Sequence, residues 1–198
     1  MSSLSIFEIF VFLNRKKCVT LAPVFLEKSL GRVFSMSKKN KLNGIVSKIN
    51  TLPEFVRVKA LTTFFGTVVK FTGTTGIKVE ELTEKRAVVT LKNKKSVQNH
   101  IGSVHAVASI LIAESATGYL AGMNVPESSV NVIKTIKADY VKRAKGDMRA
   151  VATITDEQVK LMQSQEKGET VVKVTVTDAD GKEPILMEMV WAWTPKKR

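Results

Sequence analysis

A run of polar and small residues leads into a strongly apolar stretch near the middle of the chain. Asn99, Gly102 and His105 stand three residues apart, and Glu114 follows nine residues after the histidine. Residues 102–121 are apolar on nearly every face of a helix, which is typical of a buried helix. A carboxylate in such a helix is unfavourable unless it is paired or hydrogen-bonded. Glu114 is therefore either a satisfied core acid or a functional acid with a shifted pKa.

These residues resemble a motif of the hotdog-fold acyl-CoA thioesterases of the phenylacetic-acid-degradation type. In that family an Asn, a Gly and a His-Gly-Gly run precede a Leu-Ala-Asp run. Asn99, Gly102 and His105 match the first three, and Glu114 takes the place of the acid. Residues 139–147 also resemble the family's strand after the helix, which ends in a small residue, a base and Gly-Asp.

The resemblance covers residues 75–194 and is closest to an uncharacterised, thioesterase-like branch. It implies that water hydrolyses an acyl-CoA thioester without a cofactor. Glu114 would activate the water or attack directly. The Ala106 N–H at a helix N-terminus would hold the oxyanion, and Asn99 would bind the acyl carbonyl or the water. Two departures bear on catalysis, because Ala106-Val107 replaces the family's Gly-Gly and Glu replaces its Asp.

Some of the matched residues also have ordinary structural roles. Asn99 suits an N-terminal cap or a turn. A histidine near a helix start is commonly a cap or a satisfied core residue. Gly102 and His105 are therefore assigned to the substrate-binding region and not to the chemistry.

The spacing of two matched residues bears on the oligomeric state. At about 100° per residue, nine residues place His105 and Glu114 about 180° apart around one helix. The two cannot easily face one small site within a single chain. A site shared between two subunits removes this conflict, and the family resemblance also implies one. We therefore expect a homodimer or a dimer of dimers.

Basic residues follow the expected helix, on the next strand and at its glycine bend. Coenzyme A carries several phosphate charges, and Lys or Arg binds phosphate well. Lys142, Arg143 and Lys145 are the candidates for this contact. The alternative is a solvated strand face.

The elements around the motif predict an α+β fold. The long helix is expected over residues 102–121, with Gly122 ending it. A short helix is expected to start at Thr155, which has capping-box spacing to Gln158. Segments with alternating or β-branched residues predict strands. They are residues 77–82, 86–91, 130–141, 148–154, 170–177 and 185–193. The turns at 83–85 and 178–181 predict that the first two and the last two of these strands form hairpins. A helix that is apolar on nearly all sides must pack against other elements, and an antiparallel sheet wrapped around one central helix, the hotdog fold, provides that packing.

The N-terminal third differs from the rest. We expect an extension over 1–35, a helical region over 36–72 and the hotdog domain over 73–198. The extension has few acids and several Ser, Lys and Arg, a composition that a mitochondrial transit peptide would have, but a plain N-terminal extension is the preferred interpretation. Met36 is an alternative start. Residues 43–70 predict helix, packed on the domain or lying on a membrane surface.

Charge and length limit the classes of function. The chain has 198 residues, enough for one domain with a full core. Its net charge is +13, and residues 1–60 hold 11 basic against 3 acidic residues. Such a balance attracts nucleic acid, anionic membrane or a phosphorylated small molecule. Nucleic acid is the weakest candidate, because basic and aromatic residues do not alternate. The apolar patch at 6–13 is too short to span a bilayer.

The single cysteine, Cys18, excludes an intrachain disulfide and, with two histidines, cannot complete the usual zinc ligand set. We expect no metal and an intracellular location, cytoplasmic or mitochondrial. Two functions remain. One is an acyl-CoA thioesterase, and the other is a catalytically silent hotdog dimer that binds acyl-CoA, lipid or a protein partner. Glu114 and Ala106 separate the two.

Overall fold

The computed structural model describes residues 40–197, which belong to one compact unit. The expectations for residues 1–35, a targeting segment among them, lie outside the described residues.

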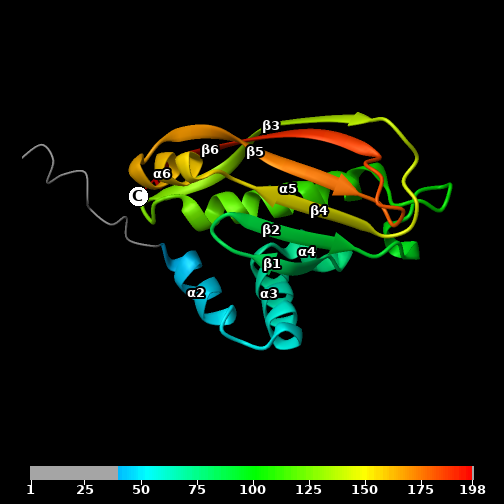
Figure 1. The fold of residues 1–198 in the computed structure, drawn as a ribbon, viewed down its shortest axis with the longest axis horizontal. Coiled ribbons are helices and arrows are strands. Elements are labelled where there is room, and N and C mark those ends of the chain that lie inside the picture. Colours follow the sequence, from blue (N-terminus) through cyan, green and yellow to red (C-terminus); the bar gives the residue numbers. More distant parts are fainter. Residues whose placement is uncertain (1–39, 198) are drawn as a thin grey trace, which may run out of the picture. The chain divides into compact units, whose positions relative to one another are not determined.

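Six antiparallel strands form one sheet in the order β1-β2-β4-β5-β6-β3. They are β1 (Lys78–Leu82), β2 (Arg86–Leu91), β3 (Ser129–Tyr140), β4 (Met148–Thr153), β5 (Gly168–Thr177) and β6 (Ile185–Pro195). The sheet curls around one long helix, α5 (Ala106–Asn124), as Figure 1 shows. This is the hotdog fold that the sequence predicted, with β1 and β3 as the two edges of the sheet.

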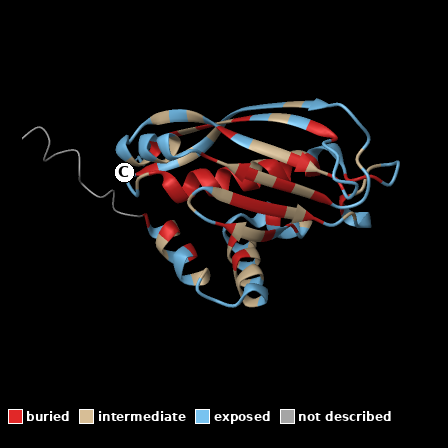
Figure 2. Ribbon diagram, in the orientation of Figure 1, coloured by how far each residue is buried: buried red, intermediate tan, exposed pale blue. Residues whose placement is uncertain are grey.

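The central helix is buried along most of its length. Of its 19 residues, 15 are buried, and Figure 2 shows it as an almost continuous buried segment. By length and composition it is the one helix of residues 40–197 that could cross a membrane, but 78% of that stretch is buried inside the domain. The sheet, and not lipid, covers its apolar faces.

Both predicted ends of this helix were wrong. The helix begins at Ala106 instead of 102, because the preceding residues form a separate turn. It continues past Gly122 to Asn124. A Cβ at Gly122 would lie 3.2 Å from the Leu42 side chain, so the glycine serves close packing with a neighbouring helix and does not end its own.

In the described part of the chain, three helices precede the sheet: α2 (Lys41–Ile49), α3 (Glu54–Val68) and α4 (Lys70–Thr75). The predicted helical region is thus interrupted before Pro53, which is the N-cap of α3. Leu61 and Phe65 of α3 are buried in the core of the domain. Phe65 stacks on Tyr119 of α5 with ring centroids 3.9 Å apart. The helical region therefore packs on the domain through part of its surface.

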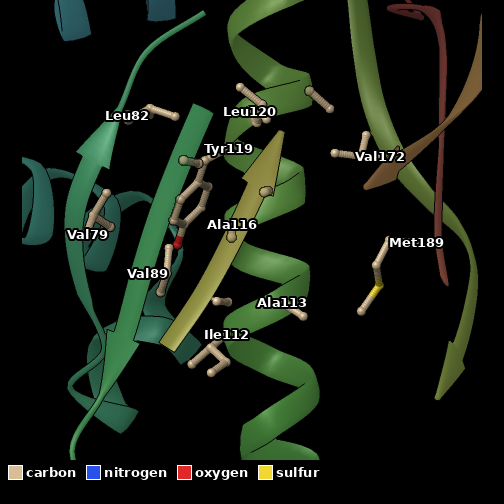
Figure 3. Packing of buried hydrophobic residues seen from close by; sticks show 14 of the residues in the cluster. Val79, Leu82, Val89, Ile112, Ala113, Ala116, Tyr119, Leu120, Val172 and Met189 are labelled. Atoms are coloured by element: carbon tan, nitrogen blue, oxygen red, sulfur yellow. The ribbon is translucent and has the colours of Figure 1, made fainter. Parts of the chain in front are cut away.

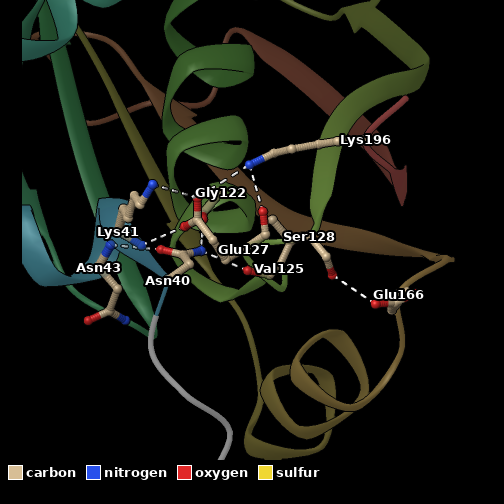
Figure 4. A network of polar contacts seen from close by, with 9 residues as sticks. All are labelled: Asn40, Lys41, Asn43, Gly122, Val125, Glu127, Ser128, Glu166 and Lys196. Carbon is tan, nitrogen blue, oxygen red and sulfur yellow. Dashed lines mark hydrogen bonds and ion pairs between the residues drawn. The ribbon is translucent and has the colours of Figure 1, made fainter. Parts of the chain in front are cut away.

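A buried asparagine fastens α2 to the end of the central helix (Figure 4). The Asn40 amide donates to the carbonyl oxygens of Gly122 and Val125, each at 2.7 Å. Its carbonyl oxygen accepts from the Asn43 N–H at 2.8 Å and so caps α2. These bonds satisfy carbonyls that the last turn of α5 leaves without intrahelical partners.

Small side chains let the sheet approach α5 closely. Figure 3 shows Ala113 and Ala116 between larger residues of the core. At Gly118 a Cβ would lie 2.6 Å from the ring of Trp191 on β6. The Trp191 indole N–H donates to the Thr117 hydroxyl at 2.8 Å, which holds the ring over the glycine. The sheet therefore contacts backbone, as well as side chains, of the helix.

Two predicted local signals are confirmed. Thr155 and Gln158 form a complete capping box at the start of α6 (Asp156–Ser164). The turn after β5 closes through Asp178, whose carboxylate accepts from the N–H groups of Asp180 and Lys182.

A pair of glycine substitutions tests the close packing of α5. Gly118→Ala should lower the free energy of unfolding by about 1–2 kcal/mol, because overpacking against the indole outweighs the gain in helix propensity. Gly44→Ala in α2 is the matched control. A Cβ there meets nothing within 4 Å, so it should stabilise by about 0.5–1 kcal/mol. Urea denaturation measures both. Equal stability of the two variants would contradict the packing argument.

Candidate active site

A tight turn over residues 98–104 precedes the central helix. The Gly102 N–H donates to the Asn99 carbonyl at 3.1 Å, and the Asn99 N–H donates to the Ser103 carbonyl at 2.9 Å. Gly102 has a φ of +74°, which favours glycine. The Asn99 side-chain oxygen accepts from the N–H groups of Ile101 and Ser103, both at 3.1 Å. The Asn-x-x-Gly spacing therefore builds a hairpin turn, and the Asn99 carbonyl oxygen is occupied within it.

The helix starts at the residue after the turn. His105 is the N-cap of α5, and its Nδ1 accepts from the Val107 N–H at 3.2 Å. The His105 N–H donates to the Val97 carbonyl at 2.8 Å. The Ala106 N–H lies in the first turn, where helix geometry provides no acceptor. Within residues 40–197 it donates to no other group, so it is free to meet a ligand.

Residues at and after the end of β3 hold the turn and the helix start in place. The Arg143 guanidinium donates to the Ile101 carbonyl at 2.7 Å and to the Ser103 hydroxyl at 3.1 Å. The Tyr140 hydroxyl donates to the Ala106 carbonyl at 2.8 Å. Tyr140 and Ser103 were not predicted as site residues, since neither carries a sequence signal of its own. Their position becomes visible only when β3 returns beside the turn.

A pocket of about 200 Å³ brings four of the predicted site residues together. Asn99, Ala106, Lys142 and Arg143 all line it. Lys145 does not line it; its ammonium pairs with Asp180 at 3.3 Å. The exposed lysine at the pocket is thus Lys142, while part of the Arg143 guanidinium is already bound to the turn.

A second pocket, of about 480 Å³, lies on another side of the helix start. His105 lines it, together with apolar side chains that include Phe71 of α4 and Val107 and Leu111 of α5. Its lining contains no carboxylate and no Lys or Arg. This pocket has the apolar character that an acyl chain requires.

Glu114 lines neither pocket. It lies half-buried in the middle of α5, and burial raises the pKa of its carboxyl group above the ordinary 4.5. No N–H or O–H group of residues 40–197 donates to this carboxylate. At about 100° per residue, Glu114 lies about 20° from Val107 and 60° from Leu111 around the helix. Glu114 therefore lies on the side of α5 that lines the apolar pocket, about one helical turn beyond Leu111.

The helix separates the acid from the oxyanion donor. Ala106 and Glu114 are eight residues apart, which is about 12 Å along the axis at 1.5 Å per residue. A base and an oxyanion donor that act on one carbonyl lie within hydrogen-bond reach of it, about 3 Å. Ala106 and Glu114 of the same chain therefore cannot fill both of the roles predicted for them at a single carbonyl group.

One edge of the sheet is open. β3 pairs only with β6 among the described strands, over its whole length from Ser129 to Tyr140. Apolar side chains on it are 41–51% exposed, namely Val130, Val132, Ile136 and Tyr140. At the opposite edge the Val79 N–H of β1 donates to the Thr62 hydroxyl of α3 at 3.0 Å, so that edge is partly covered. Within residues 40–197, β3 is thus a long uncovered edge strand with exposed apolar side chains among its polar ones, and such an edge is a template for pairing with another chain.

Residues 40–197 thus form a hotdog domain with a turn-and-helix pocket at one end of its central helix. Residues 57–193 match the model of a family described as "Domain of unknown function (DUF4442)", and the chain belongs to this family. No curated protein matches the chain.

Solved structures share the fold at low sequence identity. A Pseudomonas aeruginosa protein of unknown function, termed a probable thioesterase, is 20% identical with a TM-score of 0.63, covering 73% of this chain and 97% of its own. A thioesterase from Haemophilus influenzae is 14% identical with a TM-score of 0.57, covering 70% and 90%. A thioesterase family protein from Silicibacter pomeroyi is 16% identical with a TM-score of 0.56, covering 68% and 96%. At such low sequence identity, the similarity to these structures shows a shared fold.

The anchoring of the turn by Arg143 can be tested directly. Arg143→Leu should accelerate amide hydrogen exchange at Gly102 and Ser103 by about tenfold, since hydrogen bonds from a charged group contribute about 1.5–3 kcal/mol. Lys142→Leu is the control, because the Lys142 side chain forms no hydrogen bond or ion pair with any other residue between 40 and 197, although it lines the same pocket. Equal exchange in the two variants would show that Arg143 does not hold the turn.

Proposed function

We propose that the chain is an acyl-CoA thioesterase whose sites are shared between two subunits. The observation that carries the proposal is the half-buried Glu114 carboxylate, which has a raised pKa and no hydrogen-bond donor within the described chain. A buried acid without a structural partner needs another reason to be there. A carboxyl group whose pKa is raised by burial is also a stronger base than an exposed one, which suits a general base. Two of the structural relatives above are termed thioesterases, and one a probable thioesterase, which favours the same chemistry.

The proposed reaction is hydrolysis by an activated water. Glu114 takes a proton from water as the oxygen adds to the thioester carbonyl carbon. The resulting oxyanion accepts a hydrogen bond from the Ala106 N–H, assisted by the helix dipole. Collapse of this intermediate breaks the carbon–sulfur bond, and the thiolate of coenzyme A takes up the proton. Lys142 and the remaining N–H groups of Arg143 would contact the coenzyme A phosphates, with Lys145 further out.

The second subunit follows from the two separated halves of the site. If two copies pair along β3, one sheet continues into the other, and the exposed Val132 and Ile136 side chains become covered. Such a two-fold contact is isologous, so each subunit offers both its Ala106 end and its Glu114 to the partner. Two complete sites then arise, each with the donor of one chain and the acid of the other.

A second candidate function is supported by one specific difference from the family motif. Val107 stands where that motif has glycine, and its side chain is 56% exposed at the mouth of the apolar pocket. A β-branched side chain there narrows the approach to the helix start. The chain would then bind acyl-CoA or another lipid as a dimer without hydrolysing it.

Glu114→Gln distinguishes the two candidates. In the thioesterase, turnover of acyl-CoA should fall at least a hundredfold, since general-base catalysis contributes about 10²–10⁴-fold, while substrate affinity stays the same. Thiol release from a panel of acyl-CoA chain lengths measures the loss.

The same variant has a stability consequence whose sign follows from the pKa. An acid whose pKa is raised by folding ionises more easily when unfolded, so its ionisation reduces stability as pH rises above 4.5. Glu114→Gln should therefore raise the melting temperature at neutral pH and leave it unchanged in acid.

If the folded Glu114→Gln variant hydrolysed acyl-CoA as fast as the wild type, Glu114 would have no part in the chemistry.

Ala106→Pro removes the oxyanion donor and little else. Ala106 is the first residue of α5, where proline is tolerated, and the preceding His105 has the extended backbone that proline requires, with φ −61° and ψ 141°. Turnover should fall by about 10²–10³-fold, as for loss of one oxyanion donor, with the fold retained.

Mixing the two inactive variants tests the shared site. A mixed dimer combines Ala106 of the Glu114→Gln chain with Glu114 of the Ala106→Pro chain, and so contains one intact site. Unfolding and refolding an equal mixture should restore about a quarter of wild-type activity, because half the dimers are mixed and each has one site of two. Activity no higher than that of the separate variants would exclude the shared arrangement.

A further inference from the structure

The far end of the α2–α3 hairpin carries apolar side chains that nothing in the described chain covers. Phe55 is 80% exposed, the highest value among the large apolar residues. Leu52, three residues before it and on the other side of Pro53, is 38% exposed. Figure 1 shows the loop that joins α2 and α3 at the end of both helices that lies away from the sheet. We call residues 50–59 the hairpin tip.

The packing of α3 explains why the tip stays exposed. The helix buries only Leu61 and Phe65, both in its second half. At about 100° per residue, Phe55 lies about 120° and 80° from these two around the helix, so it faces away from the core. A groove of about 700 Å³ runs beside it, and its lining combines the apolar Phe55 and Val58 with polar and charged side chains, namely Glu54, Lys59, Thr62, Thr63 and Lys78. A single exposed apolar residue is ordinary, but a phenylalanine at a protruding tip beside a groove marks an interaction surface.

The charge around the tip is positive and largely unpaired. Residues 40–78 contain six Lys or Arg and one acid. Lys48, Arg57, Lys59 and Lys78 form no salt bridge with any other residue of the described part of the chain. Lys59 and Lys78 also line the groove beside Phe55.

The single acid of this region offsets only part of the charge at the tip. It is Glu54, in the first turn of α3, where the helix dipole stabilises a carboxylate, and it lines the same groove as Lys59 and Lys78. The cations around the tip therefore outnumber its one acid, and the tip keeps a net positive charge.

We propose that the hairpin tip docks on an anionic lipid bilayer. Phe55 and Leu52 enter the headgroup layer, and Lys48, Arg57 and Lys59 face the lipid phosphates. Aromatic residues suit the membrane interface, and each nearby Lys or Arg adds attraction to an anionic leaflet. Apolar contact combined with positive charge separates this partner from a second copy of the chain, whose own tip carries the same charge and would repel it. The proposal does not depend on the thioesterase reaction.

Vesicle sedimentation with the full chain tests the proposal. Vesicles of phosphatidylcholine with phosphatidylserine should retain the chain, vesicles of phosphatidylcholine alone should retain much less, and high salt should release it. Phe55→Ser should weaken binding to the anionic vesicles by about tenfold, through loss of buried apolar area. Phe55→Trp should keep or strengthen it. Val171→Ser on β5 is the matched control, since Val171 is 49% exposed and remote in sequence from the tip.

A charge reversal provides the second arm. Arg57→Glu combined with Lys59→Glu should abolish binding to anionic vesicles. Lys167→Glu combined with Lys173→Glu changes the net charge equally on exposed positions and should leave most of the binding. Residues 1–39 are the same in every variant, so differences among variants report on the tip.

Two outcomes would overturn the proposal. The first is anionic-vesicle binding that is equal in the wild type and in Phe55→Ser. The second is a fall in oligomer mass by light scattering in Phe55→Ser without a change in vesicle binding, which would assign the tip to self-association. Turnover of a soluble short-chain acyl-CoA by Phe55→Ser should equal that of the wild type, so that loss of vesicle binding is distinct from failure of the proposed reaction.

Discussion

The burial of α5 is the constraint on which the rest of the structure depends. A helix of 19 residues that is apolar on nearly all sides has no face for water, so it must be covered all round. A single curved antiparallel sheet covers most of it, and α2–α4 cover much of what the sheet leaves open. The small residues Ala113, Ala116 and Gly118 set how closely this cover can approach. The same burial makes Glu114 exceptional, because it is the one charged side chain in the helix.

The sequence predicted the elements well where a local pattern determines them. The two hairpins and the capping box at Thr155 depend on turn chemistry and on a period of two, which neighbouring residues carry by themselves. The ends of α5 depend on distant contacts instead. The turn at Asn99 is stabilised by Arg143, some forty residues later, and the last turn of the helix is bonded at the Gly122 and Val125 carbonyls by the amide of Asn40, some eighty residues earlier. Neither contact has a signature within the helix sequence.

In the candidate site, too, some features could be predicted from local sequence and others depend on distant contacts. The motif pointed to Asn99, Ala106 and Lys142, and the fold does place them around one pocket. The expectation of a shared site came from the angle between His105 and Glu114. In the structure His105 is a helix cap, so that angle carries little weight. The separation of Ala106 and Glu114 along the helix axis also predicts a site shared between two subunits. This argument is stronger, because a rigid helix cannot shorten. The sequence assigned Arg143 to phosphate binding, whereas its guanidinium donates to the Ile101 carbonyl and the Ser103 hydroxyl, since a base suited to phosphate is equally suited to backbone carbonyls.

The two surfaces proposed for contact lie at opposite edges of one sheet and therefore do not compete. Pairing of two chains through β3 uses the edge farthest from β1 in the strand order. The β1 edge is packed by α3, which carries the hairpin tip away from it. A dimer joined at β3 consequently keeps a tip on each subunit. Two weakly binding tips on one particle bind a membrane more strongly than one, since the second contact is made at high effective concentration. Weak attraction at each tip is then sufficient, which agrees with a surface made of one phenylalanine, one leucine and a few unpaired cations.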